Sequence, residues 1–189
     1  MKAGTWTARC SAACLVLAST PIPATAQTGI VDELKIGVLA HDVALFDKHI
    51  ENGADLNFEM LFTPPDIFAA IGSPRPHLGG TVNTAGNTDH GYFGLTWGIE
   101  LIQSLFGHGD GVFLNGSLGG ALQGGYENNA PPGRKSLGST ALFRESIELG
   151  YQATPSMSVS GFVDHMSNAD LARRNAGLTD AGARFGFKF

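Results

Sequence analysis

Apolar and polar residues alternate with a period of two along most of this chain, which is the pattern of half-buried β-strands. The alternation is clearest over residues 53–62, where every second residue is apolar and the residues between them include Asp55, Asn57 and Glu59. The pattern predicts eight strands, at residues 33–40, 53–62, 77–84, 91–101, 112–122, 139–151, 157–168 and 181–189. One helical turn is expected at residues 66–71, inside a proline-rich connection.

The polar faces of these strands carry charges of both signs, which could pair inside a narrow lumen. They are Asp55, Glu59, Glu100, Arg144, Glu148, Arg184 and Lys188. The last strand alternates Phe185, Phe187 and Phe189, which is similar to the C-terminal assembly signal of bacterial outer-membrane barrels. Eight strands suffice to close a small barrel filled by side chains. We therefore predict an all-β, eight-stranded antiparallel transmembrane barrel of the bacterial outer membrane, in preference to a soluble periplasmic barrel that binds a small ligand.

Residues 1–26 have the pattern of a secretory signal peptide. Lys2 and Arg9 precede a short apolar run, and residues 24–26 form a small-x-small cleavage pattern. Both cysteines, Cys10 and Cys14, fall inside this segment, so the mature domain, residues 27–189, is expected to have no disulfide and no thiolate metal site. Without Lys2 and Arg9, 10 of the 12 basic residues remain against 17 acidic ones, a formal charge of −7. This balance excludes nucleic acid as an expected partner.

The candidate chemistry lies at the end of the seventh predicted strand. His165 and Ser167 are two residues apart, so they share the face of Val159 and Val163, with Cα atoms about 6.5–7 Å apart. A histidine beside a serine is the start of a base–nucleophile pair. Counted from a periplasmic N-terminus, this strand end lies near the outer surface, and its apolar face points away from the lumen. The pair should therefore face the outer leaflet, where its substrate would be a lipid.

These residues resemble a known family. The run His165-Met166-Ser167-Asn168, followed by Asn175-Ala176-Gly177 and a terminal strand, is similar to the lipid A 3-O-deacylases, also labelled acyloxyacyl hydrolases. The resemblance implies an outer-membrane carboxylic ester hydrolase that removes an acyl chain from the lipid A of lipopolysaccharide. It implies Ser167 as the nucleophile, His165 as the general base, and Asn168 with nearby backbone N–H groups as the oxyanion stabiliser.

One element of the family pattern is missing. The acid that orients the histidine is expected four residues after Asn175, where this chain has Thr179, with Asp180 next to it. Strict alternation would point Thr179 outward and Asp180 into the lumen. A β-bulge would bring Asp180 to the outer face, because one extra residue reverses the facing of a strand. We expect Asp180 to be the third catalytic residue by this route, with Thr179 as the alternative.

The weak third position leaves a second hypothesis open, a non-enzymatic outer-membrane barrel that serves adhesion or membrane stability. The other five histidines show no ligand spacing, and we predict no metal and no cofactor. The expected partners are lipopolysaccharide and the outer-membrane lipids. The sequence leaves a homodimer open.

Overall fold

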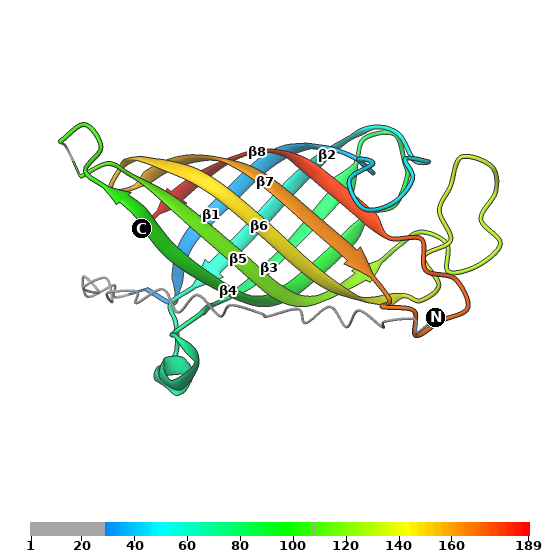
Figure 1. Ribbon diagram of the computed structural model, residues 1–189, viewed down its shortest axis with the longest axis horizontal. Helices are drawn as coiled ribbons and strands as arrows, with labels where there is room; N and C mark the ends of the chain where they lie inside the picture. The colour runs from blue at the N-terminus through cyan, green and yellow to red at the C-terminus, as the bar shows by residue number, and fades with distance from the viewer. Residues whose placement is uncertain (1–28, 108) are drawn as a thin grey trace, which may run out of the picture.

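The computed structural model of the protein describes residues 29–107 and 109–189, and the segment read as a signal peptide lies outside them. Eight strands form one closed barrel in which each strand pairs with its neighbours in sequence (Figure 1). They are β1 (Val31–Ala40), β2 (Ala54–Phe62), β3 (Arg75–Asn83), β4 (His90–Gln103), β5 (Gly111–Gln123), β6 (Ala141–Thr154), β7 (Met157–Ser167) and β8 (Leu178–Lys188). All pairs are antiparallel, and β1 closes the barrel against β8, from Glu33 opposite Lys188 to Ala40 opposite Ala181. The predicted fold class is confirmed.

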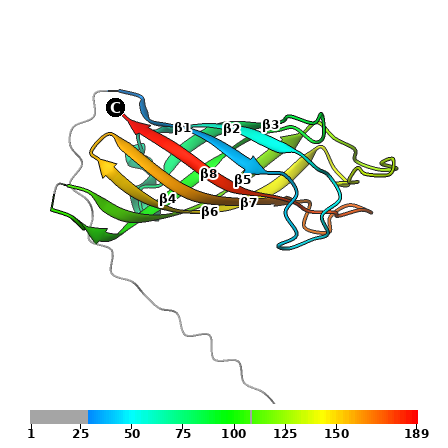
Figure 2. The ribbon, with the colours of Figure 1, turned by 90° about the horizontal axis from the view of Figure 1, so that it is seen from above.

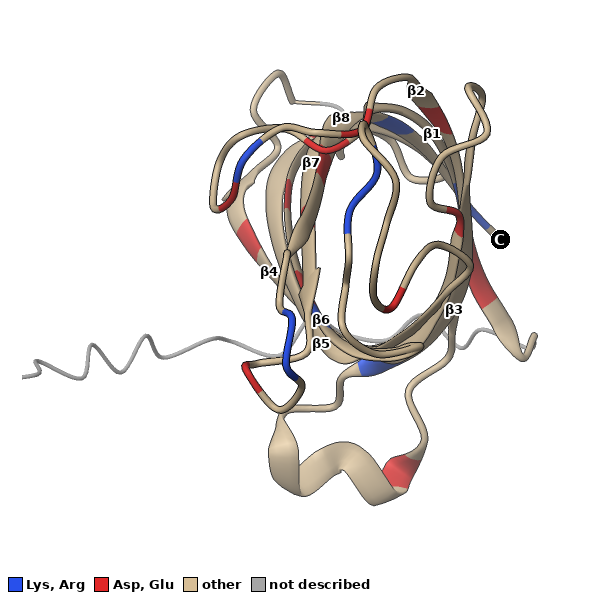
Figure 3. Ribbon diagram, turned by 90° about the vertical axis from the view of Figure 1, so that its right-hand side faces the viewer, with Lys and Arg blue, Asp and Glu red and all other residues tan. Residues whose placement is uncertain are grey.

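The expected helical turn is a 3₁₀ helix, η1 (Asp66–Ile71), in the connection from β2 to β3. Figure 3 shows this connection hanging outside the barrel wall. Trp97 of β4 fixes it there, because its indole Nε1–H donates to the carbonyl oxygen of Ile71 over 2.8 Å. Among the described residues, no helix is both long and apolar enough to cross a membrane.

The two ends of the barrel differ. The N-terminal end of β1 and the C-terminal end of β8 share one end with the β4–β5 and β6–β7 turns, and the register shifts of the sheet lie near this end. The loops of residues 41–53, 84–89, 124–140 and 168–177 gather at the opposite end, as Figures 1 and 2 show. We call this the loop end. Because β7 runs toward it, His165 and Ser167 lie close to these loops.

The outer wall is an apolar belt, and this belt explains the alternation of the sequence. Ile36, Leu56, Phe93, Leu118 and Ile147 are all at least half exposed. A contiguous apolar surface of this extent is costly in water but is normal against lipid. The outward side chains therefore favour a membrane barrel over the soluble alternative.

The lumen is packed with paired charges. Arg184 donates to Glu59 over 2.6 Å, and Arg144 pairs with Asp164 over 2.8 Å. Lys35 pairs with Glu148. Most of the charges predicted to face the lumen are buried there, but Glu100 is exposed, because it lies beside the register shift near the end of β4 and bonds Gln103 instead. A small cluster of buried apolar side chains lies on the loop-end side of these ion pairs. It is formed by Tyr92, Ala121, Leu137, Leu142, Met166 and Leu178.

Candidate active site

β7 turns His165 and Ser167 to the outer wall, as its alternation predicts. Asp164 and Met166 are each 1% exposed and point inward, whereas His165 and Ser167 are half-buried on the opposite side. Asp164 pairs with Arg144 in the lumen, so it takes no part in the outer site. The two candidate residues thus lie on the face that continues the apolar belt.

The imidazole of His165 has three close neighbours. Its Nδ1 lies 2.8 Å from the hydroxyl of Thr179, the residue directly opposite on β8. Gly177 lies against the ring edge, where a Cβ at this position would be 2.5 Å from Cε1 of His165 and 3.0 Å from Nε2. Phe46 covers the ring with an edge-on contact, 5.3 Å between centroids. With the Nδ1 proton donated to Thr179, Nε2 is the nitrogen that can accept a proton.

Ser167 ends β7 opposite Phe143 of β6. Within the part of the chain that the structure describes, no hydrogen bond joins its hydroxyl to His165. Candidate catalytic hydrogen bonds are often long in the absence of substrate and tighten only when it binds. The spacing along one strand face keeps both groups within reach of a shared substrate atom.

The structure does not bring Asp180 to His165, so the expectation of a β-bulge is wrong. β8 pairs with β7 without a register shift from Phe187 to Leu178, and Asp180 keeps its inward facing. It is fully buried in the lumen, where its Oδ1 accepts a hydrogen bond of 2.9 Å from the backbone N–H of Asp42 and lies 3.4 Å from Nδ1 of His41. Thr179 therefore occupies the position beside His165.

Asn168 follows Ser167 and holds the adjoining loop of residues 168–177. Its side-chain Nδ2 donates to the carbonyl oxygens of Leu137, at 2.7 Å, and Arg174, at 2.5 Å. Its backbone N–H donates to Oδ1 of Asn175 over 3.0 Å. Both hydrogens of the amide are thus engaged within the protein, and the side chain shapes the loop that starts at the nucleophile candidate.

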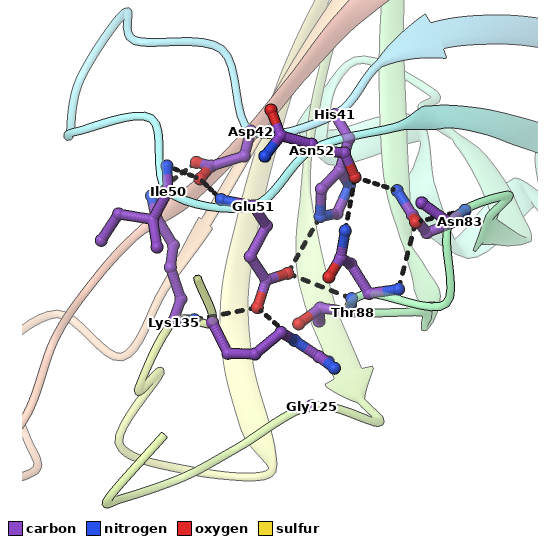
Figure 4. A network of polar contacts seen from close by, with 12 residues as sticks. His41, Asp42, Ile50, Glu51, Asn52, Asn83, Thr88, Gly125 and Lys135 are labelled. Carbon is purple, nitrogen blue, oxygen red and sulfur yellow. Dashed lines mark hydrogen bonds and ion pairs between the residues drawn. The ribbon is translucent and has the colours of Figure 1, made fainter. Parts of the chain in front are cut away.

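The loop end is held by a network of buried charges (Figure 4). Glu51 accepts hydrogen bonds from the backbone of Lys135, at 2.9 Å, and from Nε of Arg134, at 3.0 Å, and it contacts His41. The ammonium of Lys135 contacts Asp42 and donates to the carbonyl oxygen of Gly177 over 2.5 Å. The network therefore connects the loops of residues 41–53 and 124–140 to Gly177, which packs against His165.

The two titratable groups at the centre of this network have shifted pKa values. Burial opposes the charge of His41, but hydrogen bonds to Asp55 and Glu51 outweigh it and raise the pKa of His41 from 6.5 to about 10. Burial likewise opposes the charge of Glu51, but hydrogen bonds from His41, Lys135, Thr88 and Arg134 lower its pKa from 4.5 to about 2. Each group stabilises the charged form of the other.

His41, Asp55 and Asp180 place three potential metal-ligand atoms within 4.8 Å of one another. His41 Nδ1 lies 2.8 Å from Asp55 and its Nε2 lies 3.0 Å from Glu51, so both nitrogens act as donors to carboxylates. A ring that donates from both nitrogens is an imidazolium and has no lone pair for a metal. This cluster is an ion-pair network, and we assign no metal to it.

Two contacts of His165 could not be read from the sequence pattern. Phe46 belongs to a loop with no periodicity, and the backbone N–H of Val43 attaches this loop to the carbonyl oxygen of Thr179 over 2.7 Å. Gly177 was visible only as part of the Asn-x-Gly run, with no sign that it touches the ring. Both contacts depend on closure of the barrel.

The protein is a closed barrel with a packed lumen and an apolar outer belt, which are the features of a membrane barrel. Its candidate catalytic pair, a histidine and a serine, lies on the outer wall. The family model of the lipid A 3-O-deacylases (PagL) matches residues 52–188. The chain belongs to this family.

Solved structures show the same fold. The crystal structure of the outer membrane enzyme PagL aligns with a TM-score of 0.60 and 16% identity, covering 83% of this chain and 99% of that one. Neisserial surface protein A (NspA) aligns with a TM-score of 0.50 and 9% identity, over 84% of this chain and 96% of that one. A search of curated protein sequences finds no significant match.

Proposed function

We propose that the protein is an outer-membrane enzyme that hydrolyses an ester-linked acyl chain of lipid A, with Ser167 as nucleophile and His165 as general base. The observation that carries this proposal is the position of the pair on the outer wall, with the ring of His165 held by Thr179. Membership of the lipid A 3-O-deacylase family supports the substrate class. The apolar belt supports a location in the bilayer, where a lipid ester can approach the wall directly.

The proposed reaction has two halves. Nε2 of His165 takes the proton of Ser167 as its Oγ attacks the ester carbonyl, and the same imidazole then protonates the departing sugar hydroxyl. An acyl group remains on Ser167. A water molecule, deprotonated by His165, attacks this acyl-enzyme, and the fatty acid leaves as the serine is regenerated.

The oxyanion of each tetrahedral intermediate needs N–H donors close to Ser167. The amide of Asn168 is engaged with Leu137 and Arg174, so we assign to it the task of shaping this segment. The backbone N–H groups that follow it are the proposed donors. Ala169 and Asp170 both have positive φ, 53° and 61°, and successive backbone N–H groups in such turns can form an anion-binding concavity.

The test is incubation of the purified protein, in detergent, with lipopolysaccharide, followed by mass spectrometry of the lipid A. The expected result is loss of one hydroxyacyl chain, abolished in Ser167→Ala and in His165→Ala. Ser156→Ala, in the turn that precedes β7 at the other end of the barrel, is the matched control and should keep full activity. Unchanged lipid A with the native protein would overturn the proposal and favour the non-enzymatic barrel.

A further inference from the structure

Glu145 of β6 breaks the charge pattern of the wall. It is exposed on the outer face, whereas the other charged side chains of β6, β7 and β8 have inward parity. These inward residues are Arg144, Glu148, Asp164, Asp180, Arg184 and Lys188. A carboxylate in the apolar belt of a membrane barrel lowers stability unless it lies close to the interface, so its presence requires a reason.

The surroundings of Glu145 on its own side are apolar. Leu118 lies opposite it on β5 and is 63% exposed, and Phe143 and Ile147 flank it along β6 at 54% and 55% exposure. The carboxylate makes no hydrogen bond and no ion pair with any described residue. It is an unpaired acid among side chains that would contact lipid tails.

The remaining neighbour of Glu145 is His165, directly opposite on β7. Side chains at such positions have Cβ atoms about 4.5–5.5 Å apart, and opposite charges there attract. His165 is therefore flanked on its outward face by Thr179 from β8 and Glu145 from β6. The hydroxyl of Thr179 can accept a hydrogen bond from Nδ1, but it carries no charge.

We propose that Glu145 is the acid that balances the charge of His165, in place of an acid on β8. The inference rests on the proposed function, because a hydrolase histidine becomes an imidazolium during each half of the reaction. Thr179 orients the neutral ring. Glu145 stabilises the charged ring from the other strand, in a medium of low dielectric constant where such attraction is strong.

The first test compares Glu145→Gln with the native protein in the lipopolysaccharide assay. We expect kcat to fall about 100-fold, with KM unchanged within about twofold, because the acid acts on the imidazolium and not on substrate binding. Glu145→Asp should keep part of the rate. Glu100→Gln, which removes an exposed carboxylate close to the other end of the barrel, is the matched control and should keep the native kcat.

The second test moves the carboxylate from β6 to β8, on the other side of His165. In Glu145→Gln combined with Thr179→Glu, the carboxylate lies on β8 and should recover at least about tenfold of the lost rate. All variants are compared for folding by the mobility of the unheated barrel on electrophoresis. Native kcat in folded Glu145→Gln, or a loss recovered neither by Glu145→Asp nor by the relocated acid, would overturn the inference. Either result leaves the proposed function intact if Ser167→Ala is inactive. An inactive native protein would overturn both the proposed function and this inference.

Discussion

Lys135, from the β5–β6 loop, donates a hydrogen bond of 2.5 Å to the carbonyl oxygen of Gly177, whose backbone lies against the ring of His165. The lysine is 1% exposed and also contacts Asp42 of the β1–β2 loop. One buried ammonium thus connects two loops to the candidate active site. The position of His165 depends on the loop end as well as on the strands.

A side chain at position 177 should lower the rate of deacylation, because it would displace the ring of His165. In Gly177→Ala the new Cβ would lie 2.5 Å from Cε1 of His165, so the ring must move away from it. We expect deacylation to fall by about tenfold to 100-fold, since small displacements of reacting groups are costly. The rate of lipid A cleavage measures this, and Gly161→Ala is the control, because a Cβ there meets nothing within 4 Å. Equal rates for both variants would contradict the assignment.

The hydroxyl of Thr179 should matter for the rate more than for folding. Thr179→Val keeps the shape of the side chain but removes the partner of His165 Nδ1, 2.8 Å away. A single hydrogen bond is worth about 0.5–1.5 kcal/mol, so we expect a rate loss of about threefold to tenfold. Thr179→Ser, which keeps the hydroxyl, should stay close to the native rate. A fully active Thr179→Val would show that Thr179 does not orient the ring.

Phe46 should act on substrate binding. Its ring is 71% exposed and packs edge-on against His165, so an acyl chain that reaches the site would contact it. We expect Phe46→Ala to raise KM about threefold to tenfold with little change in kcat, in line with the 0.5–1.5 kcal/mol of an aromatic contact. Steady-state kinetics with lipopolysaccharide tests this. The matched control is Phe106→Ala, equally exposed at 71% but at the other end of the barrel, and an equal effect of both would reject a local role.

The stability of the loop network should depend on pH, and the shifted pKa values of Glu51 and His41 give the direction. Glu51 has its pKa lowered from 4.5 to about 2, so its stabilisation is complete above 4.5 and is lost as the pH falls toward 2. His41 has its pKa raised from 6.5 to about 10, so its stabilisation is complete below 6.5 and is lost as the pH rises through 10. The network should be strongest between pH 4.5 and 6.5.

Proteolysis of the loop of residues 124–140 across this pH range measures the effect. In Glu51→Gln the acid-side dependence should disappear, and the loop should open more easily by about 2 kcal/mol, because hydrogen bonds to a charged group are lost. Ser139→Ala, in the same loop, serves as the control. Proteolysis of the native protein that does not vary with pH would contradict the assignment.

The fold could be predicted from the sequence because a strand has a strict period of two. The alternation of Asp55, Asn57 and Glu59 with apolar neighbours marks the inward face before any tertiary contact is known. The same parity turns His165 and Ser167 outward. It also turns Asp180 inward, and the structure follows this rule where we had expected a bulge.

The rest of the site depends on pairings between strands and loops that no single segment encodes. Glu145 becomes a neighbour of His165 only through the register of β6 with β7. Phe46 reaches the same ring because β1 closes the barrel beside β8. Asn168, a candidate donor by its motif, is bonded instead to carbonyl oxygens of two loops. These relations appear only when the barrel is closed.

The packed interior determines the route by which substrate and product would reach and leave the site. Arg184 pairs with Glu59 and Arg144 pairs with Asp164 inside the barrel, so the described strands fill their interior with buried side chains. Reactant and product would both travel sideways, in two dimensions, along the outer wall. The turnover rate in a native outer membrane should then depend on the fluidity of the surrounding leaflet. A more rigid leaflet should lower this rate although the protein itself is unchanged.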